Sequence, residues 1–313
     1  MRIAVLGGDA RQWEAARVLA SAGYEVRVFG LRQPDGSRAG GPQPSGGLPA
    51  GDPQPVVAAS AQEAVAGAGA VVGPVQGTLP TGAVWTQPGL EPVVLSQEDL
   101  AGLAPGAIVL MGMANEPFRR LCREVGVDLF EYRDEDDFAL LNAIPSAEGA
   151  IAMAMEMTSF TLFGSCCFVL GLGRTGEILA LMLKGIGAKT FVAARRPEAL
   201  ARVEAHGHQA IPFAELERAI GQAQVVFNTV PAPILYGKTL EALQRGTVII
   251  DLASAPGGTD FEAAKVRGIK AVLAPGLPGK VAPESAGRYV ARLVIRTLKS
   301  RPPVGREEGG RQP

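Results

Sequence analysis

The chain contains little histidine, so few side chains can take up or release a proton near neutral pH. Its 313 residues include 2 histidines, His206 and His208, both in the run Ala205-His206-Gly207-His208. This run predicts solvated turn residues rather than a metal pair or a catalytic base. The lack of an available histidine argues against the hydroxy-acid dehydrogenases that use one as their acid–base group.

Cysteine is equally scarce. Of the 3 cysteines, Cys166 and Cys167 are adjacent in a predicted strand, and Cys122 falls in a predicted helix. These positions form no disulfide framework, and their spacing fits no zinc site. We expect three packing residues in a reducing, cytosolic setting.

Neither excess charge nor long apolar runs are present. The net charge of −1 gives no indication of a nucleic-acid or anionic-membrane partner. The longest apolar runs have the length of strands, so we expect no signal peptide and no membrane span. A hydrophobic content of 47% is sufficient for two α/β domains of ordinary size.

Apolar runs alternate with helical segments in both halves of the chain. In the first half, strands are predicted over 2–6, 24–29, 70–75, 107–111 and 127–131. In the second half, they are predicted over 166–170, 190–194, 224–229, 247–252 and 271–274. The alternation predicts an α/β fold with two Rossmann-like, doubly wound parallel-sheet domains and an interdomain cleft.

The predicted domains divide near residue 140. Residues 1–140 would form an N-terminal α/β domain for substrate or partner, and 141–300 a dinucleotide-binding domain. The polar tail 301–313 is predicted to be disordered, and the segment 33–55, rich in Gly, Pro and Ser, to be a mobile surface loop.

Two helices are expected to connect these domains. A linking helix is predicted over 134–157, interrupted near Ile144-Pro145. The last helix, 282–299, is long and amphipathic and is expected to pack back on the first domain. The acidic run 134–137 is interpreted as a solvated helix start, and no metal site is expected.

One glycine-rich turn follows a predicted buried strand and opens a predicted helix. Its sequence is Gly171-Leu172-Gly173-Arg174-Thr175-Gly176. Gly171 permits the tight turn, Gly173 lets a pyrophosphate approach the backbone, and Gly176 lets the helix pack on the strand. Arg174 could reach a phosphate oxygen, and the helix N-terminus offers N–H donors. This context favours a dinucleotide site over an ordinary glycine-rich turn.

The next strand ends in arginines where an NAD-binding fold usually carries an acidic residue. Arg195 and Arg196 stand there, and a guanidinium suits a 2′-phosphate. We therefore predict NADP, with NAD possible and a solvated basic turn as the alternative. Further cofactor contacts are expected where later strands end, at Asn228, Thr229, Val230, Pro231, Asp251, Ala253, Pro275 and Gly276.

Five runs spread over nearly the whole chain form a specific combination. They are residues 3–12 (IAVLGGDARQ), 144–149 (IPSAEG), 169–176 (VLGLGRTG), 251–261 (DLASAPGGTDF) and 273–279 (LAPGLPG). Together they resemble the family of the dipicolinate synthase A subunit. The resemblance implies oxidation of a dihydro- or hydroxytetrahydro-dipicolinate to dipicolinate, with NADP as hydride acceptor. It also implies a flavoprotein-like partner, the synthase's B subunit, and a place in the mother-cell cytoplasm of a sporulating bacterium.

A substrate with two ring carboxylates needs cationic or N–H donors. Arg11, Asn115 and Ser146 are the predicted substrate-binding residues, although Asn115 and Ser146 could equally cap helices. Removal of a proton needs a base, and with no histidine available we predict Asp9 first and Glu148 second.

Two other interpretations stay open. The chain could be a nucleotide-binding subunit that positions a catalytic partner. It could also be an enzyme of the alanine dehydrogenase or transhydrogenase type, against which the missing acidic residue and histidine argue. In each case an oligomer is expected.

Overall fold

The structure, a computed structural model, describes residues 1–32 and 53–301. It divides into two compact units. Unit 1 comprises Met1–Phe138 with Pro283–Pro313, and unit 2 comprises Ala139–Ala282. Most of the loop predicted over 33–55 and nearly all of the tail predicted over 301–313 lie outside the described residues.

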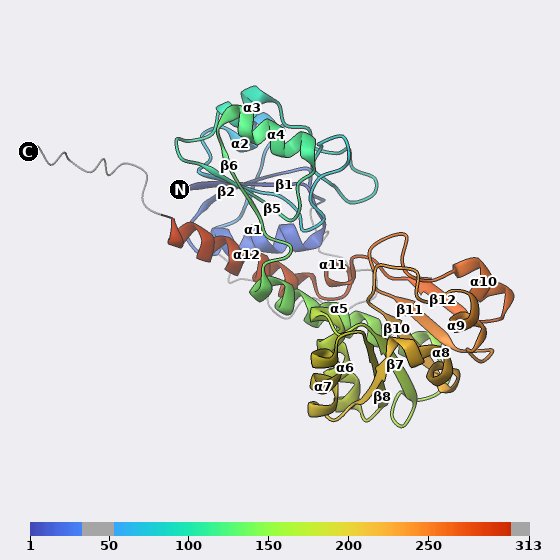
Figure 1. Ribbon diagram of the computed structural model, residues 1–313. Coiled ribbons are helices and arrows are strands. Elements are labelled where there is room, and N and C mark those ends of the chain that lie inside the picture. The colour runs from blue at the N-terminus through green and yellow to red at the C-terminus, as the bar shows by residue number, and fades with distance from the viewer. Residues whose placement is uncertain (33–52, 302–313) are drawn as a thin grey trace, which may run out of the picture. The chain divides into compact units, whose positions relative to one another are not determined.

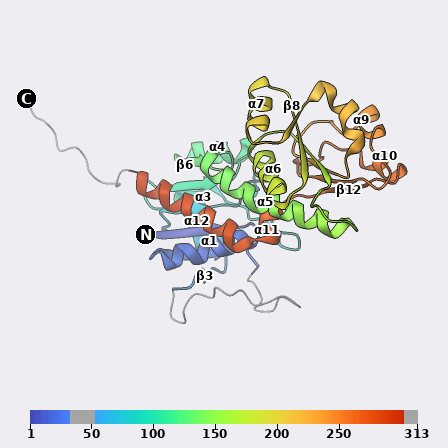
Figure 2. The same ribbon diagram turned by 90° about the horizontal axis from the view of Figure 1, so that it is seen from below.

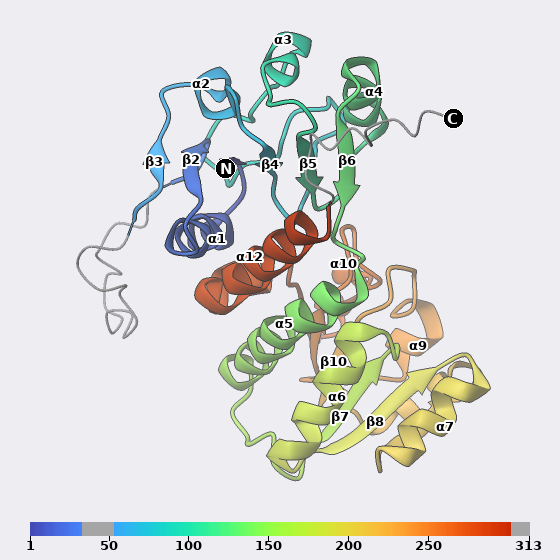
Figure 3. The same ribbon diagram turned by 90° about the vertical axis from the view of Figure 1, so that its left-hand side faces the viewer.

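Unit 1 is built on a parallel sheet of six strands in the order β3-β2-β1-β4-β5-β6. The strands are β1 (Arg2–Leu6), β2 (Glu25–Phe29), β3 (Val56–Val57), β4 (Ala70–Val72), β5 (Ile108–Met111) and β6 (Asp128–Glu131). Figure 3 shows β3, β2, β4, β5 and β6 in this order across the unit. The strand order reverses between β1 and β4, which is the point where doubly wound sheets bind ligands.

Helices cover both faces of this sheet. Alternate side chains of β1 explain why, since Ile3 and Val5 enter one apolar core and Ala4 and Leu6 the other. The helices are α1 (Ala10–Ser21), α2 (Ala61–Val65), α3 (Gln97–Ala101), α4 (Glu116–Val125) and α12 (Pro283–Ser300). α1 and α12 lie together on one face, and α2, α3 and α4 lie on the other (Figure 1).

The last helix of the described chain is thus part of unit 1. Gly287 of α12 approaches α1 so closely that a Cβ placed on it would lie 2.5 Å from Glu14 Cβ and 2.7 Å from the carbonyl oxygen of Arg11. Around this contact, α12 buries Ala286, Val290, Ala291, Leu293 and Val294. A residue without a side chain allows the two helix backbones to pack this tightly.

Unit 2 has a second six-stranded parallel sheet, in the order β12-β11-β10-β7-β8-β9. Its strands are β7 (Cys166–Leu170), β8 (Lys189–Ala194), β9 (Gln209–Pro212), β10 (Val225–Asn228), β11 (Val248–Asp251) and β12 (Lys270–Leu273). The order reverses between β7 and β10. The predicted α/β fold with two doubly wound sheets is confirmed, and the cleft expected between the domains stays a prediction.

The helices of unit 2 also form two layers. They are α5 (Asp136–Met157), α6 (Arg174–Ile186), α7 (Pro197–Ala205), α8 (Leu216–Ala219), α9 (Gly237–Glu241), α10 (Phe261–Val266) and α11 (Leu277–Val281). α5, α6 and α7 pack in the core on one face, and α8, α9 and α10 in the core on the other. Figure 2 shows α10 beside β12.

Each sheet has one strand more than the five expected. The additional strands are β3, with two exposed residues, and β9, which ends at Pro212. Both lie at a sheet edge. Short edge strands need no long apolar run, so hydrophobic pattern alone does not reveal them.

The interruption expected near Pro145 is wrong, because α5 runs unbroken over Asp136–Met157 with this proline inside. Proline has no N–H for the carbonyl of Leu141, a local cost of roughly 3 kcal/mol. Ser146 Oγ donates to the carbonyl of Asn142 at 3.0 Å, which is not the carbonyl that Pro145 leaves without its helical donor. The face of the helix buried in the core consists of Ala147, Ala150, Ile151 and Ala154. Tertiary packing of α5 therefore outweighs the tendency of Pro145 to break the helix.

α5 is also long and apolar enough, by length and composition alone, to cross a membrane. No other helix among the described residues meets this test. Core helices of folded domains meet it as well, and the buried alanines of α5 pack in the core of unit 2.

The expectation that both histidines are solvated is wrong for His208. This side chain is 7% exposed, and neither of its ring nitrogens has a hydrogen-bond partner among the described residues. Burial, together with the nearby charges of Lys184 and His206, lowers the pKa of His208. His208 is therefore neutral at pH 7 and serves as a packing residue between α7 and β9.

The cysteines are free. Cys122 and Cys167 are buried, and burial raises the pKa of the two thiols to about 11 and about 12, respectively. Thiols so rarely ionised are poor nucleophiles, which agrees with a packing role.

Candidate functional site

The glycine-rich turn of unit 2 lies at the switch point of its sheet, between the carboxyl ends of β7 and β10. Gly171 has a φ of +96°, and its N–H donates to the carbonyl of Ala193 near the end of β8. A Cβ on Gly176 would lie 2.0 Å from the carbonyl oxygen of Gly171. A Cβ on Gly173 would meet nothing within 4 Å. Gly171 and Gly176 thus shape the turn, and Gly173 leaves open space above it.

A pocket of about 540 Å³ opens over this turn. It is lined by Gly171, Leu172, Gly173, Ala194, Arg195, Arg196, Ala199, Phe213, Thr229, Val230 and Pro231. Gly173 is the N-cap of α6, so the N-terminus of this helix, with its backbone N–H groups, lies at the turn. The size, open backbone and helix terminus fit a dinucleotide.

The cationic side chains around the pocket differ in their contacts. Arg195 and Arg196 are both exposed and line it. Arg196 Nε lies 3.3 Å from Glu198 Oε1, whereas no ion pair of Arg195 is found in the described part of the chain. Arg174 and Thr175 open α6 but do not line the pocket. Of the two predicted 2′-phosphate ligands, Arg195 is thus the one with no competing carboxylate among the described residues.

Asn228 and Asp251 are fully buried and bond to each other instead of facing the pocket. Asn228 Nδ2 donates to Asp251 Oδ1 at 3.0 Å, and Asp251 Oδ2 accepts from Thr259 Oγ1 at 2.7 Å and from Gly258 N at 2.8 Å. Val230 N donates to Asn228 Oδ1 at 3.0 Å. These side chains hold the strand-end loops, so a contact to cofactor there would come from backbone.

The remaining predicted cofactor residues fall into two groups. Thr229 lines the pocket, but its hydroxyl donates to the carbonyl of Leu170 at 2.9 Å. Ala253 is buried and donates its N–H to Asp251, and Pro275 and Gly276 are exposed and do not line the pocket.

Phe213 is a pocket residue that the sequence did not indicate. It directly follows β9, is half-buried and contributes to the lining of the pocket. A lone aromatic after a missed edge strand carries no local signature, so only the fold could place it here.

In unit 1, Asp9 and Arg11 meet at the carboxyl end of β1. Asp9 is the N-cap of α1, and its Oδ1 accepts from Arg11 N at 3.1 Å. The Arg11 guanidinium bonds both oxygens of the same carboxylate, with Nη2 to Oδ2 at 2.7 Å and Nε to Oδ1 at 2.9 Å. Arg11 is 3% exposed. A buried bidentate pair of this kind has a fixed geometry.

The ionisation of Asp9 reflects two opposing effects. Burial raises the pKa of a carboxyl group, but the hydrogen bonds and charge of Arg11 and the bond from Gln76 lower it further than burial raises it. The net effect is a lowered pKa. Asp9 is therefore held as a carboxylate and is a weak base.

Two glutamines complete this polar cluster. Gln12 is fully buried, and its Oε1 accepts from Asp9 N at 3.2 Å in a capping box. Gln76, which follows β4, donates Nε2 to Asp9 Oδ2 at 2.8 Å. Gln76 Oε1 is buried without a hydrogen-bond partner among the described residues. The Gln12 side chain interacts with the buried hydroxyl of Tyr132. The cluster thus contains a spare acceptor at the switch point of the sheet.

The other predicted substrate and acid–base residues have different surroundings. Asn115 caps α4 by accepting from Phe118 N at 3.2 Å, and its amide donates to the carbonyl of Leu79. Ser146 caps no helix, because it lies within α5. Glu148 is exposed on α5 in unit 2. Within unit 1, Asp9 and Arg11 are brought into contact, whereas Asn115 bonds to other residues.

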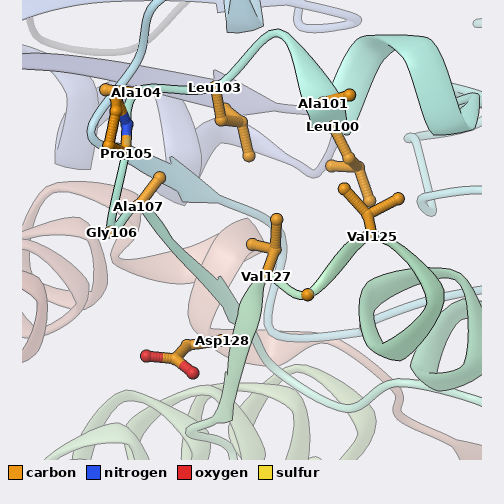
Figure 4. Close-up of a pocket in the computed structure, with 11 residues that line it drawn as sticks. Leu100, Ala101, Leu103, Ala104, Pro105, Gly106, Ala107, Val125, Val127 and Asp128 are labelled. Atoms are coloured by element: carbon orange, nitrogen blue, oxygen red, sulfur yellow. The ribbon is translucent and has the colours of Figure 1, made fainter.

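A smaller cavity of about 230 Å³ lies at the amino ends of β5 and β6, away from the carboxyl ends of the unit 1 strands. Figure 4 shows its short apolar lining, which includes Leu103, Val125 and Val127, with Asp128 as the charged member. Ligands of doubly wound sheets bind at the carboxyl ends of the strands, so this cavity is not a candidate site. Among residues 1–32 and 53–301, no group of three His, Cys, Asp or Glu side chains could hold a metal.

Comparison with known proteins covers both units. The family model for the N-terminal domain of the dipicolinate synthase A subunit matches residues 2–133, and the model "Alanine dehydrogenase/PNT, C-terminal domain" matches residues 149–299. The dipicolinate synthase A subunit of Bacillus subtilis (strain 168) is 34% identical over 99% of this chain and 98% of its own length.

Solved structures lead to the same family as the sequence comparison. The A-subunit structure of dipicolinate synthase from Bacillus halodurans superposes with a TM-score of 0.80 at 33% identity, covering 96% of this chain and 98% of that one. The Bacillus subtilis A chain gives 0.80 at 34%, covering 96% of each. Transhydrogenase from Sinorhizobium meliloti, at 18% identity and a TM-score of 0.63 over 95% and 92%, shares the fold. The chain belongs to the family of the dipicolinate synthase A subunit.

Proposed function

We propose that the protein is an NADP-dependent oxidoreductase subunit that forms dipicolinate from its cyclic precursor. The observation that carries this proposal is the open pocket above Gly173, in a chain that is related over its whole length to the A subunit of dipicolinate synthase. The pocket supports binding of a dinucleotide, and the relationship supports the proposed class of substrate.

In unit 2, the backbone of Gly171–Gly173 and the start of α6 would hold the pyrophosphate. Arg195, with Arg196 beside it, would bind the 2′-phosphate and favour NADP over NAD. Thr229, Val230 and Pro231 would line the remainder of the pocket. When bound, the oxidised nicotinamide supplies the acceptor for a hydride.

In unit 1, the Arg11 guanidinium would bind a ring carboxylate of the substrate. Asp9 holds this guanidinium in place through the bidentate pair. Because the pKa of Asp9 is lowered, we propose orientation of Arg11 as the main role of Asp9. Its predicted role as a base, and that of Glu148, would show as an ionisation in the pH profile of the rate.

The overall change balances as an aromatisation. A dihydrodipicolinate ring loses a hydride from one carbon and a proton from a neighbouring ring atom, which leaves the pyridine ring. A hydroxytetrahydro precursor must first lose water. The proton passes to a carboxylate or to solvent.

The name of the relative, one lettered member of a synthase, implies a second subunit. We propose that this partner is the flavoprotein-like B subunit and that the pair works in the mother-cell cytoplasm. The weak basicity of Asp9 also keeps a second role open, in which this chain binds nucleotide and the partner carries the redox step.

The test is formation of dipicolinate, followed by chromatography. The cyclic precursor would be made freshly with the preceding aldol-condensation enzyme and supplied with NADP or NAD, with and without the partner. Product from this chain alone would place the redox step here, and product only with both subunits would favour the shared role. Tight nucleotide binding without product in any combination would contradict the proposed substrate.

A further inference from the structure

The two amide atoms of Gln76 have different surroundings. Nε2 donates to Asp9 Oδ2 at 2.8 Å. Oε1 is buried and has no hydrogen-bond partner among the described residues. A buried carbonyl oxygen without a donor is destabilising by about 1–3 kcal/mol, so an occupant that donates a hydrogen bond is expected there.

The orientation of this amide is fixed by its neighbour. Rotating the amide by half a turn would place Oε1 against the Asp9 carboxylate, which Arg11 keeps ionised. Two oxygens with no proton between them repel. The Oε1 side of the amide therefore presents an acceptor to whatever lies beside it.

The location of this acceptor is that of a ligand site. Gln76 follows β4 and Asp9 follows β1, the two strands between which the sheet order reverses. Gln12, in the same cluster, interacts through its side chain with the buried hydroxyl of Tyr132. Gln76 Oε1 is therefore the group that an occupant must satisfy, and the occupant must donate to it.

We propose that Gln76 determines specificity by accepting a hydrogen bond from an N–H or O–H of a non-aromatic cyclic dicarboxylate. This inference rests on the proposed function. The hydroxytetrahydro ring carries an O–H donor and a dihydro ring carries an N–H in its enamine form, whereas the aromatic dicarboxylate carries only a ring-nitrogen lone pair and carboxylate oxygens. Gln76 thus favours the unoxidised ring and disfavours retention of the aromatic product, because a buried acceptor facing a lone pair stays unsatisfied.

Three probes separate the contribution of the donor from that of ring shape. They are cis-piperidine-2,6-dicarboxylate, whose ring nitrogen carries protons at pH 8, cis-tetrahydropyran-2,6-dicarboxylate, whose ring oxygen carries none, and pyridine-2,6-dicarboxylate. Binding of each to the full chain is measured by calorimetry at pH 8 with NADP present, and binding of NADP is measured separately.

We expect the wild-type chain to bind the piperidine ring at least about ten-fold more tightly than the tetrahydropyran ring, since a hydrogen bond from a charged donor contributes about 1.5–3 kcal/mol. In Gln76→Met, which keeps the length of the side chain, this ratio falls by about ten-fold. The matched control is Gln97→Met, an exposed glutamine of unit 1 that donates to Glu124. Its ratio stays at the wild-type value.

A wild-type ratio near one overturns the proposal without any variant, because Oε1 would then make no use of the ring donor. An equal loss of all three ligands in Gln76→Met also overturns it, because Gln76 would then merely support the Asp9–Arg11 pair. If wild-type chain binds NADP but none of the rings, the proposed substrate class fails, and the role of Gln76 fails with it.

Discussion

Gly173 separates nucleotide binding from folding more cleanly than its neighbours in the turn. We expect Gly173→Leu to abolish nucleotide binding with an unchanged melting temperature, because its φ of −93° suits any residue and its Cβ would meet no atom within 4 Å. The added side chain would fill the space for a pyrophosphate. Calorimetric titration with NADP and a thermal melt test this.

Gly176→Ala is the contrasting variant. Its Cβ would lie 2.0 Å from the carbonyl oxygen of Gly171, so this change should lower the melting temperature. Persistent NADP binding in Gly173→Leu would contradict the assignment of the turn.

Arg195 tests the choice of cofactor. We expect Arg195→Ala to weaken NADP binding by about 10- to 100-fold, the range for hydrogen bonds to a charged group, and to leave NAD binding nearly unchanged. Arg196→Ala should have a smaller effect, because Arg196 lies 3.3 Å from Glu198. Titrations of each variant with both cofactors would measure this, and equal losses for NADP and NAD would reject the 2′-phosphate assignment.

His208 makes the stability of unit 2 depend on pH. Its pKa is lowered in the folded state from the ordinary 6.5. Below about pH 6.5 the unfolded chain therefore binds a proton that the folded chain does not, and stability falls with falling pH until the folded-state pKa is passed. We expect the free energy of unfolding of His208→Phe to fall less between pH 7.5 and 5.5 than that of the wild type.

The comparison is made by urea unfolding at the two pH values. His206→Gln is the control, because His206 is only partly buried and should leave most of the pH dependence in place. An identical pH dependence in His208→Phe and the wild type would show that His208 also titrates normally in the folded chain.

Among the helices, the α1–α12 contact depends on one glycine. We expect Gly287→Leu to lower the free energy of unfolding by about 1–3 kcal/mol or more, the range for overpacking, since even a Cβ would lie 2.5 Å from Glu14 Cβ. Gly185→Leu, at an exposed glycine of α6 with nothing within 4 Å of its Cβ, should be neutral or stabilising. Denaturant unfolding of both variants compares them, and similar values would show that α12 does not need the close approach.

Most elements could be predicted because their buried faces repeat in the sequence, as in β1 and β7. The failures occurred where tertiary contacts outweigh local signals. Pro145 predicts a break in α5, yet a row of buried alanines keeps the helix intact. His208 follows a glycine and looks like a turn residue, but the fold buries its side chain to 7% exposure.

The residues of the candidate sites divide in the same way. The glycine turn has a local signature that the sequence shows, and the positions of Asp9 and Arg11 directly after a strand could also be predicted. Gln76 and Phe213 could not, because their neighbours in space are distant in the chain, as the 67-residue separation of Gln76 from Asp9 illustrates. Asn228 has the position of a cofactor ligand, but the buried carboxylate of Asp251 takes its amide.

For the whole molecule, the division into units predicts that they respond differently to loss of the last helix. Unit 2 ends at Ala282, and its two cores contain no residue of α12. Unit 1 buries Val290, Leu293 and Val294 from α12 in its core. Burial of three such side chains contributes about 5–9 kcal/mol, as much as the whole stability of many domains.

A chain terminated after Ala282 should therefore lose the folding transition of unit 1 and keep NADP binding in unit 2. Differential calorimetry would then show one transition in place of two, and limited proteolysis would cut within residues 1–138 first. Calorimetric titration of the same protein with NADP should give an affinity close to that of the full chain. If NADP binding is lost together with unit 1, the dinucleotide site depends on the first unit, and the two units do not fold independently.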